Sequence, residues 1–111
     1  IQAIKGNHSA AQKSQAAMFA YMMLDAMRAN REAALAGNYN LASMTCTPVS
    51  GTTLVHNDQN YWITQMQAAM GSATCGQIQC DNQGNCTVTV QWNDSRAGGN
   101  NAETLALTSR L

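Results

Sequence analysis

The helical segment at residues 10–35 constrains the fold most, because its central turns are apolar on nearly every side. It contains no Pro or Gly and is rich in residues that favour helices. At about 100° per residue its large apolar side chains point in almost every direction; they are Met18, Phe19, Tyr21, Met22, Met23, Leu24 and Met27. A surface helix has one apolar stripe, so this helix must be covered on two sides. A chain of 111 residues can cover one side with its own sheet, and we expect something outside the chain to cover the other.

Two interpretations of the first residues stay open. Ile1 is not an initiator Met, Gly6 and Asn7 form a weak break, and Asn7 or Ser9 can cap a helix that begins there. The chain begins either at a trimmed terminus that frays or within a longer helix whose missing part would be a membrane anchor. Because no apolar run reaches the roughly 18–20 residues that span a bilayer, we expect the isolated chain to be soluble. We also expect it to be a monomer.

The charge balance argues against one class of partner. The chain has six basic and six acidic side chains, a net charge of zero and 11% charged residues. Its Lys and Arg residues are scattered, so they form no basic patch for a phosphate backbone and nucleic acid is not an expected partner. Gln, Asn, Ser and Thr take the place of charges, a composition common in proteins that work outside the cytoplasm.

The four cysteines indicate disulfide bonds in an oxidising compartment, because an even number in a small domain is typical of such proteins. They are Cys46, Cys75, Cys80 and Cys86. Their spacing lacks the close pairs of a zinc site, and no His lies near them. A turn-forming run separates Cys80 from Cys86, which favours a bridge across a hairpin and leaves Cys46 for Cys75. Four cysteines permit three pairings, so this pairing is a preference.

The chain has the length of a single domain in three parts. Residues 1–37 form the long helix, residues 38–75 a connection with a second short helix, and residues 76–111 an antiparallel sheet. Because helices precede strands without alternation, we expect an α+β fold in which the sheet packs on the long helix.

The long helix should end near Leu35, with Gly37 as its left-handed stop. Within it, Arg28 has the spacing to pair with Asp25 and with Glu32. In the connection, residues 52–55 are the only strand-like run, and the loop should pack through three apolar side chains, Tyr39, Leu41 and Met44.

The second helix is predicted to begin after a cap at Asn57 or Asp58 and to end at Gly71. Its packed face should carry Trp62, Met66, Ala69 and Met70. Its outer face should carry Gln59, Thr64 and Gln67. We expect five side chains in the core: Leu24, Trp62, Met66, Met70 and Trp92. The indole N–H of each tryptophan should donate to a backbone carbonyl.

Alternating residues predict the strands. Residues 76–80 and 86–92 form a hairpin, and residues 104–111 form a last strand. On this last strand Leu105, Leu107 and Ser109 should face one way.

No catalytic or metal-binding constellation is expected. His8 and His56 lack a Ser or Cys at motif spacing and are interpreted as surface residues. Asp94, Ser95 and Arg96 lack a nucleophile elbow, so we interpret them as a corner where Asp94 caps the turn and holds Arg96. The carboxylates form no cluster with metal-ligand spacing, so we expect no enzyme activity, metal or cofactor.

Two segments are similar to motifs of one known family. The helix carries D-x-M-R-A-N-R at residues 25–31, and a later strand and corner carry T-V-x-W-x-D-S-R at residues 89–96. Both resemble the PilV family of type IV pilus minor pilins, and the order of elements also fits, so the resemblance covers nearly the whole chain. It implies a type IV pilin fold, in which the carboxy half of a long N-terminal helix packs on an antiparallel sheet. The amino half, missing here, would anchor the subunit in the inner membrane and later pack in the filament core.

The resemblance also implies which surface and which function to expect. The sheet and the loop would cover one side of residues 16–27 and neighbouring subunits the other, through Met18, Phe19, Met22, Met23, Asp25, Arg28 and Arg31. The implied function is that of a minor pilin that acts with other minor pilins and the major pilin at or near the pilus tip. It would prime pilus assembly and support twitching motility and surface adhesion. The subunit would lie in the inner membrane and periplasm before assembly and on the cell surface afterwards.

Two alternatives stay open. A minor pseudopilin of type II secretion would share the fold and differ in the machine that it serves. A secreted adhesin or ligand-binding module would use the loops rich in Asn and Gly at residues 81–85 and 97–103.

Overall fold

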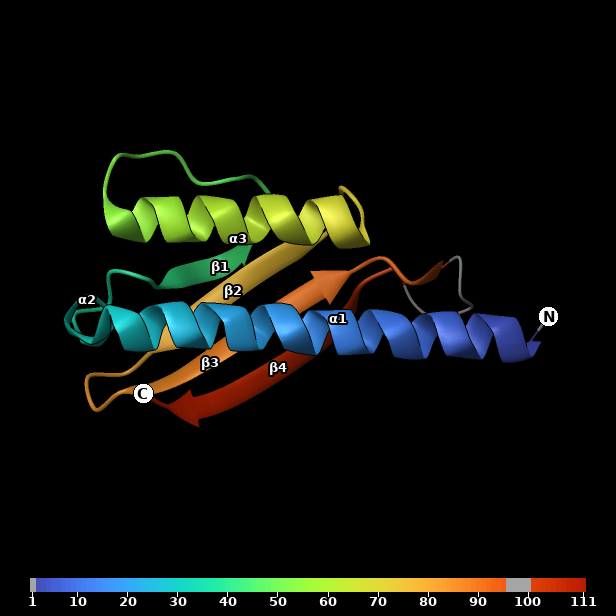
Figure 1. Ribbon diagram of the computed structural model, residues 1–111, viewed down its shortest axis with the longest axis horizontal. Helices are drawn as coiled ribbons and strands as arrows, with labels where there is room; N and C mark the ends of the chain where they lie inside the picture. Colours follow the sequence, from blue (N-terminus) through green and yellow to red (C-terminus); the bar gives the residue numbers. More distant parts are fainter. Residues whose placement is uncertain (1, 96–100) are drawn as a thin grey trace.

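Four strands form one antiparallel sheet, and two long helices lie together on one of its faces (Figure 1). The computed structural model describes residues 2–95 and 101–111, with side chains from Ser9 onward. Its elements are, in chain order, α1 (Gln2–Ala29), α2 (Arg31–Leu35), β1 (Leu41–Thr45), α3 (Leu54–Met70), β2 (Cys75–Cys80), β3 (Asn85–Trp92) and β4 (Glu103–Arg110). The strands lie in the order β1-β2-β3-β4, and each neighbouring pair is antiparallel. The expected α+β class, with a long N-terminal helix and an antiparallel sheet, is confirmed.

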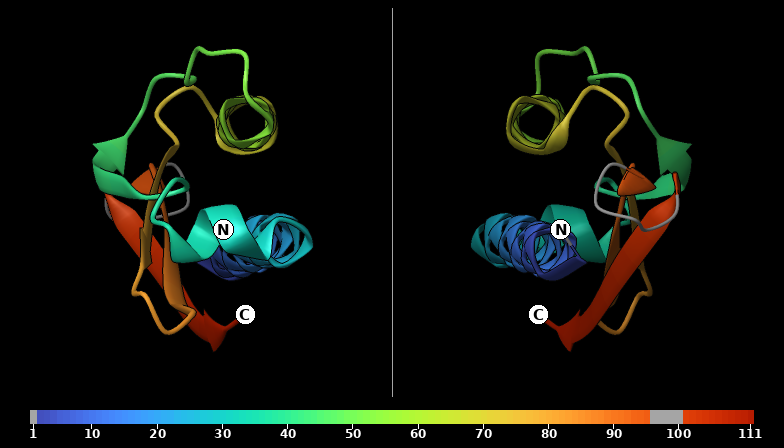
Figure 2. Two further views of the ribbon diagram at one scale, coloured as in Figure 1. Left: turned by 90° about the vertical axis from the view of Figure 1, so that its left-hand side faces the viewer. Right: turned by 90° about the vertical axis from the view of Figure 1, so that its right-hand side faces the viewer.

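The two helices cover different halves of the sheet. α1 packs on β3 and β4, α3 packs on β2, and the helices contact each other. Figure 2 shows both helices on the same side of the sheet. The buried residues of α1 recur every three or four positions, as one face of a helix requires: Ala16, Ala20, Met23, Leu24 and Met27. The core is completed by side chains of α3, β2 and β3, and it includes all five residues expected there, Leu24, Trp62, Met66, Met70 and Trp92.

The amino end of α1 shows no break. The helix starts at Gln2 and continues through Gly6 and Asn7, so it does not begin at Asn7 or Ser9. The hydroxyl of Ser9 instead donates to the carboxylate of Asp94 beyond the end of β3 (2.7 Å). Neither this helix nor any other in residues 2–95 and 101–111 is both long enough and apolar enough to cross a membrane.

The carboxy end of α1 comes earlier than predicted. A break at Asn30 separates α1 from α2, so the prediction of one helix up to Leu35 was wrong. Asn30 has φ −131° and ψ 53°, outside the helical region, and its side-chain amide donates to the hydroxyl of Tyr39 (3.3 Å). Asn leaves helices readily because its side chain bonds to nearby polar groups. Gly37, with φ +83°, is left-handed after α2 as expected.

The connection after α2 contains the strand β1, which the sequence pattern did not predict. The strand-like run at residues 52–55 does not form a strand. β1 pairs with β2, but its register shifts between Leu41 and Thr45, and its burial does not alternate. Thr53 instead caps α3, and the helix begins at Leu54. The hydroxyl of Thr53 accepts from the backbone N–H of His56 (3.1 Å), which corrects the predicted cap at Asn57 or Asp58.

The faces of α3 follow the prediction with three exceptions, one of which is Gln67, half-buried with its side-chain amide donating to the carbonyls of Cys46 (2.6 Å) and Thr74 (3.1 Å). Trp62, Met66 and Met70 are buried, whereas Ala69 is exposed. Gln59, expected on the outer face, is buried because its side-chain amide donates to the carbonyl of Tyr39 (2.9 Å). A buried polar side chain is tolerated when it is hydrogen-bonded in this way. The end of α3 before Gly71, which has φ +109°, is as predicted.

The predicted hairpin is formed by β2 and β3, with Cys80 paired to Cys86. Its turn is organised by Asp81, whose carboxylate accepts from the side chain of Asn85 (3.0 Å) and from the backbone N–H of Asn85 and of Gln83 (both 2.9 Å). These bonds, the one from the Asn85 side chain first, lower the pKa of Asp81. Gly84 has φ +91°, a conformation that other residues rarely adopt.

The last strand also follows the prediction, although it begins one residue earlier and ends one residue earlier, at Glu103–Arg110. Its residues alternate between half-buried and exposed, with Leu105, Leu107 and Ser109 on the half-buried side.

Two disulfide bonds join the preferred partners. Cys46 is bonded to Cys75 and Cys80 to Cys86, with Cα–Cα distances of 4.2 and 4.1 Å. The first bridge holds the connection against the start of β2, and the Gln67 side chain donates to the carbonyl of Cys46 beside it (2.6 Å). The second closes the hairpin. Both ends of β2 are therefore covalently tied to other segments.

Removing the two bridges should have unequal effects on stability. The half-cystines are 29 residues apart in the first bridge and 6 in the second, so the first closes a much longer loop. We expect Cys46→Ser/Cys75→Ser to lower the free energy of unfolding by about 3–4 kcal/mol and Cys80→Ser/Cys86→Ser by about 2–2.5 kcal/mol. Urea unfolding of both double variants measures the difference. Equal losses would contradict the loop-length argument.

Gly76 in β2 should tolerate no larger residue, because a Cβ atom there would overlap ring carbons Cη2 and Cζ3 of Trp62. We expect Gly76→Ala to lower the free energy of unfolding by about 1–3 kcal/mol, since the rigid ring must move. Gln79→Ala, at an exposed position of the same strand, is the matched control and should change it by less than about 0.5 kcal/mol. An unchanged urea midpoint for Gly76→Ala would show that α3 does not approach the sheet this closely.

Candidate functional site

A strip of exposed apolar side chains runs along the outer surface of α1 and onto α3. We call it the helix strip and define it as Met18, Tyr21, Met22 and Tyr61. Met18, Tyr21 and Tyr61 expose 69%, 56% and 60% of their surface, and Met22 is half-buried. The three α1 residues lie three and four positions apart, so they share one face of the helix. Large apolar side chains gathered in this way are typical of a surface that contacts another molecule.

The two parts of the strip meet at the junction of the helices. Met22 of α1 and Tyr61 of α3 line one small cavity of about 50 Å³, whose other walls are Met23, Ala26, Asp58 and Trp62. Below it, the indole N–H of Trp62 donates to the carbonyl of Phe19 in α1 (2.8 Å). This bond joins α1 to α3 and so fixes the two parts of the helix strip relative to each other.

The apolar residues predicted to face neighbouring subunits divide into three groups. Met18 is exposed, and Phe19 and Met22 are half-buried, so these three retain free surface. Met23 exposes only 1% of its surface and lies in the core. It therefore has no surface to offer a neighbouring molecule, and the prediction for Met23 needs this correction. The physical reason is its spacing from Ala16 and Ala20, which places it on the face that packs on the sheet.

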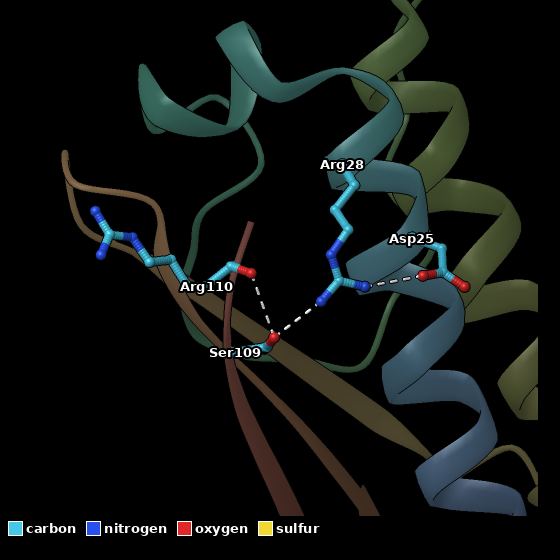
Figure 3. Close-up of polar contacts among 4 residues, drawn as sticks. All are labelled: Asp25, Arg28, Ser109 and Arg110. Atoms are coloured by element: carbon cyan, nitrogen blue, oxygen red, sulfur yellow. Dashed lines mark hydrogen bonds and ion pairs between the residues drawn. The ribbon is translucent and has the colours of Figure 1, made fainter.

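The charged residues of the predicted surface lie near the carboxy end of α1. Figure 3 shows the guanidinium of Arg28 between Asp25 and Ser109. It lies 3.0 Å from the Asp25 carboxylate and donates to the Ser109 hydroxyl of β4 (2.8 Å). The predicted pair with Glu32 is replaced by these contacts, because the break at Asn30 removes the helical spacing between Arg28 and Glu32. Arg31 is exposed on α2.

Asp58, in the wall of the cavity, is held from behind by Tyr39. The Tyr39 hydroxyl donates to the Asp58 carboxylate (2.5 Å) and accepts from the amide of Asn30 (3.3 Å). Tyr39 is fully buried. Burial raises the pKa of its hydroxyl to about 12, and the hydrogen bond to Asp58 adds to the rise. The loop after α2 is thereby fixed to α3 beneath the helix strip.

The described part of the predicted corner, Asp94 and Ser95, is arranged differently from the expectation. Asn93, not Asp94, caps the turn, through its side-chain oxygen and the backbone N–H of Ser95 (2.9 Å). Asp94 exposes 2% of its surface and accepts from Ser9 of α1, which ties the end of β3 to the long helix. The predicted contact of Asp94 with Arg96 lies outside the described residues, as do residues 97–100 of the candidate binding loop at 97–103.

The two histidines and the two tryptophans complete the set of candidate residues. His56 lies in the first turn of α3 with its Nδ1 atom 2.9 Å from the Thr53 hydroxyl, and the side chain of His8 is outside the described part of the chain. The Trp62 N–H has the expected backbone acceptor, whereas that of Trp92 is buried without a hydrogen-bond partner. Among the described side chains, those of residues 9–95 and 101–111, no group of three or more His, Cys, Asp or Glu could hold a metal ion.

The sequence prediction left two residues of the strip out of the contact surface, Tyr21 of α1 and Tyr61 of α3. On α3 it also missed the exposed Leu54, because it placed the start of the helix after Asn57 or Asp58. Leu54 and Tyr61 expose 59% and 60% of their surface. The seven-residue spacing between them is a signal in the sequence, because it places both on one helix face.

Comparison with known proteins identifies no relative: no protein-family model, curated protein or solved structure matches this chain.

Replacing Tyr39 should change how stability depends on pH. In the unfolded chain a tyrosine titrates near 10, so between pH 10 and about 12 the folded state binds more protons, and stability must fall as pH rises through this window. In Tyr39→Phe this loss should be smaller. At pH 7 the same variant should lose about 1–3 kcal/mol, because the Asp58 carboxylate loses its donor. Urea unfolding at pH 7, 10 and 11.5 measures both effects.

The matched control is Tyr61→Phe, which removes an exposed phenol and should keep the wild-type slope. Equal slopes for the wild type and Tyr39→Phe would contradict the assignment.

Proposed function

We propose that this chain is the globular part of a filament subunit, a minor pilin of a bacterial type IV pilus. The observation that carries the proposal is the helix strip, an apolar surface on the outer side of a long helix whose inner side packs on the sheet. A helix with this distribution is suited to contact two partners at once, its own sheet and a neighbouring subunit.

The two motif segments support the proposal by their place in the fold. The D-x-M-R-A-N-R segment includes the end of α1 and the break at Asn30, where Arg28 contacts Asp25 and β4. The described part of the T-V-x-W-x-D-S-R segment runs along β3 to the corner where Asp94 accepts from α1. Both segments therefore supply contacts between the long helix and the sheet, which is the arrangement that the resemblance implies for a pilin.

The disulfide bonds suit such a role. They tie the two ends of β2 to the connection and to β3, and a small domain outside the cytoplasm gains stability from such bridges. In the proposal the subunit is held in the inner membrane by a hydrophobic helix that precedes these residues. It then enters the pilus beside other minor pilins and the major pilin, where it primes assembly and supports twitching motility and adhesion.

The helix strip allows a direct test in the bacterium that carries the gene. Deletion should reduce surface pili and twitching, and the wild-type gene should restore both. Met18→Glu and Tyr61→Glu should lower piliation by about tenfold or more, because a charge buried in an apolar contact costs several kcal/mol. Asn82→Glu, an equal change of charge in the exposed hairpin turn, is the control and should restore piliation. Electron microscopy and twitching-zone diameters are the readouts, and immunoblots confirm that each variant accumulates.

Three outcomes would count against the proposal. Normal piliation in the deletion strain would remove the subunit from the pilus. Loss of secretion of folded enzymes with pili intact would assign it to a type II secretion pseudopilus. Full restoration by both Glu variants would show that the helix strip is not the contact surface.

A further inference from the structure

β4 forms an open edge of the sheet. It pairs with β3 over all eight of its residues, and in the described part of the chain no strand pairs with its other edge. Figure 1 shows it on the margin of the sheet farthest from β1 and α3. Such an edge presents a row of unpaired backbone N–H and C=O groups, which an extended strand of another molecule can bind.

The opposite edge of the same sheet is protected, and β4 is not. β1 has five residues, and its pairing with β2 is irregular, two features that blunt an edge. β4 has eight residues in unbroken register with β3 and contains no Pro. Its two charges, Glu103 and Arg110, stand at its ends, so the middle of the strand carries neither a charge nor a bulge.

The middle of β4 is a palindrome, Thr-Leu-Ala-Leu-Thr at residues 104–108. In an antiparallel pair of two copies centred on Ala106, Thr104 would face Thr108 of the second copy, and Leu105 would face Leu107. Because the partners are the same number of residues from the centre, all pairs keep the same side of the sheet. The register therefore places leucine against leucine and threonine against threonine, and both kinds of cross-strand pair are favourable.

Contacts within the chain support this register. Thr108 already exchanges a hydrogen bond with Thr87 across β3 and β4 (2.8 Å), so a threonine ladder on this face is compatible with the twist of the sheet. Leu105 and Leu107 are only half-buried under α1, and a second strand beside them would cover more of their surface. The same register brings Glu103 opposite Ser109 of the second copy, where the guanidinium of Arg28 lies (Figure 3).

We propose that two copies of this chain associate through their β4 edges, in antiparallel register centred on Ala106, to form a continuous eight-stranded sheet. The occupant of the open edge is thus a second copy, in contrast to the monomer expected from the sequence. The proposal does not depend on the proposed function, because β4 lies on the sheet and the helix strip lies on the outer side of the helices.

Cysteine cross-linking tests the register directly. In the proposed dimer the two Ala106 Cβ atoms lie about 4.5–5.5 Å apart, close to the distance that a disulfide spans. Ala106→Cys should therefore form a covalent dimer under mild oxidation. In the matched variant Thr104→Cys the two copies of the residue would be four positions apart along the strands, roughly 13 Å, and should not cross-link. Non-reducing gels with peptide mapping identify the bridge and show that the native disulfides are intact.

Sedimentation velocity over a dilution series tests the association without a cross-link. The wild type should dimerise reversibly, and Ala106→Lys, which brings two like charges together at the centre, should raise the dimer dissociation constant about fivefold or more. Gln79→Lys adds the same charge at an exposed position of β2 and should leave the constant unchanged. Equal cross-linking of the two Cys variants would overturn the proposal. So would a chain that stays monomeric but binds an extended peptide of another sequence, which would assign the edge to a different partner.

Discussion

Trp62 lies where α3, α1 and β2 meet, and its contacts fix both helices on one face of the sheet. Its indole N–H donates to the Phe19 carbonyl, and its ring lies against Gly76. Trp62 is buried. Loss of its hydrogen bond would leave the Phe19 carbonyl without this donor, and loss of its ring would open a cavity beside Gly76. The exposed position of Tyr61 follows from the same contact, because successive residues of a helix point about 100° apart. The buried ring thus sets the orientation of the outer surface.

The helix strip is a consequence of size. Four strands about 4.8 Å apart give a sheet roughly 20 Å wide, which two helices of about 10 Å diameter cover on one face. The small residues Ala16 and Ala20 let α1 lie close to the sheet, but in the described residues no third layer covers the helices from outside. Met18 and Tyr21 therefore remain exposed, although each carries a large apolar surface. The apolarity on all sides of this helix indicated such a surface from the sequence alone.

Periodicity predicted the hairpin, the last strand and most of the core, and turn chemistry predicted the disulfide pairing. Two of the wrong predictions involve contacts of Tyr39. Asn30 leaves the helix and donates to the Tyr39 hydroxyl, and Gln59 is buried by a bond to the Tyr39 carbonyl. The cap of α3 was wrong for another reason, because Thr53 accepts from the N–H of His56 and the helix begins before Asn57 and Asp58. Asn30 and Gln59 lie 9 and 20 positions from Tyr39, so a local pattern contains no information on these contacts. The burial of Met23 was missed for a related reason, because apolarity on all sides does not reveal which side faces the sheet.

The covalent and non-covalent parts of the sheet differ in a way that bears on its open edge. Both ends of β2 carry a disulfide, so β1, β2 and β3 are held by bridges and hydrogen bonds together. β4 has no bridge and is held by its ladder with β3, by the half-buried leucines under α1 and by the bond from Arg28 to Ser109. In the described part of the chain no strand pairs with its outer edge, so the backbone groups there can bond to water or to a strand of another molecule. In the described residues this small chain therefore covers neither the outer side of its two helices nor the β4 edge of its sheet.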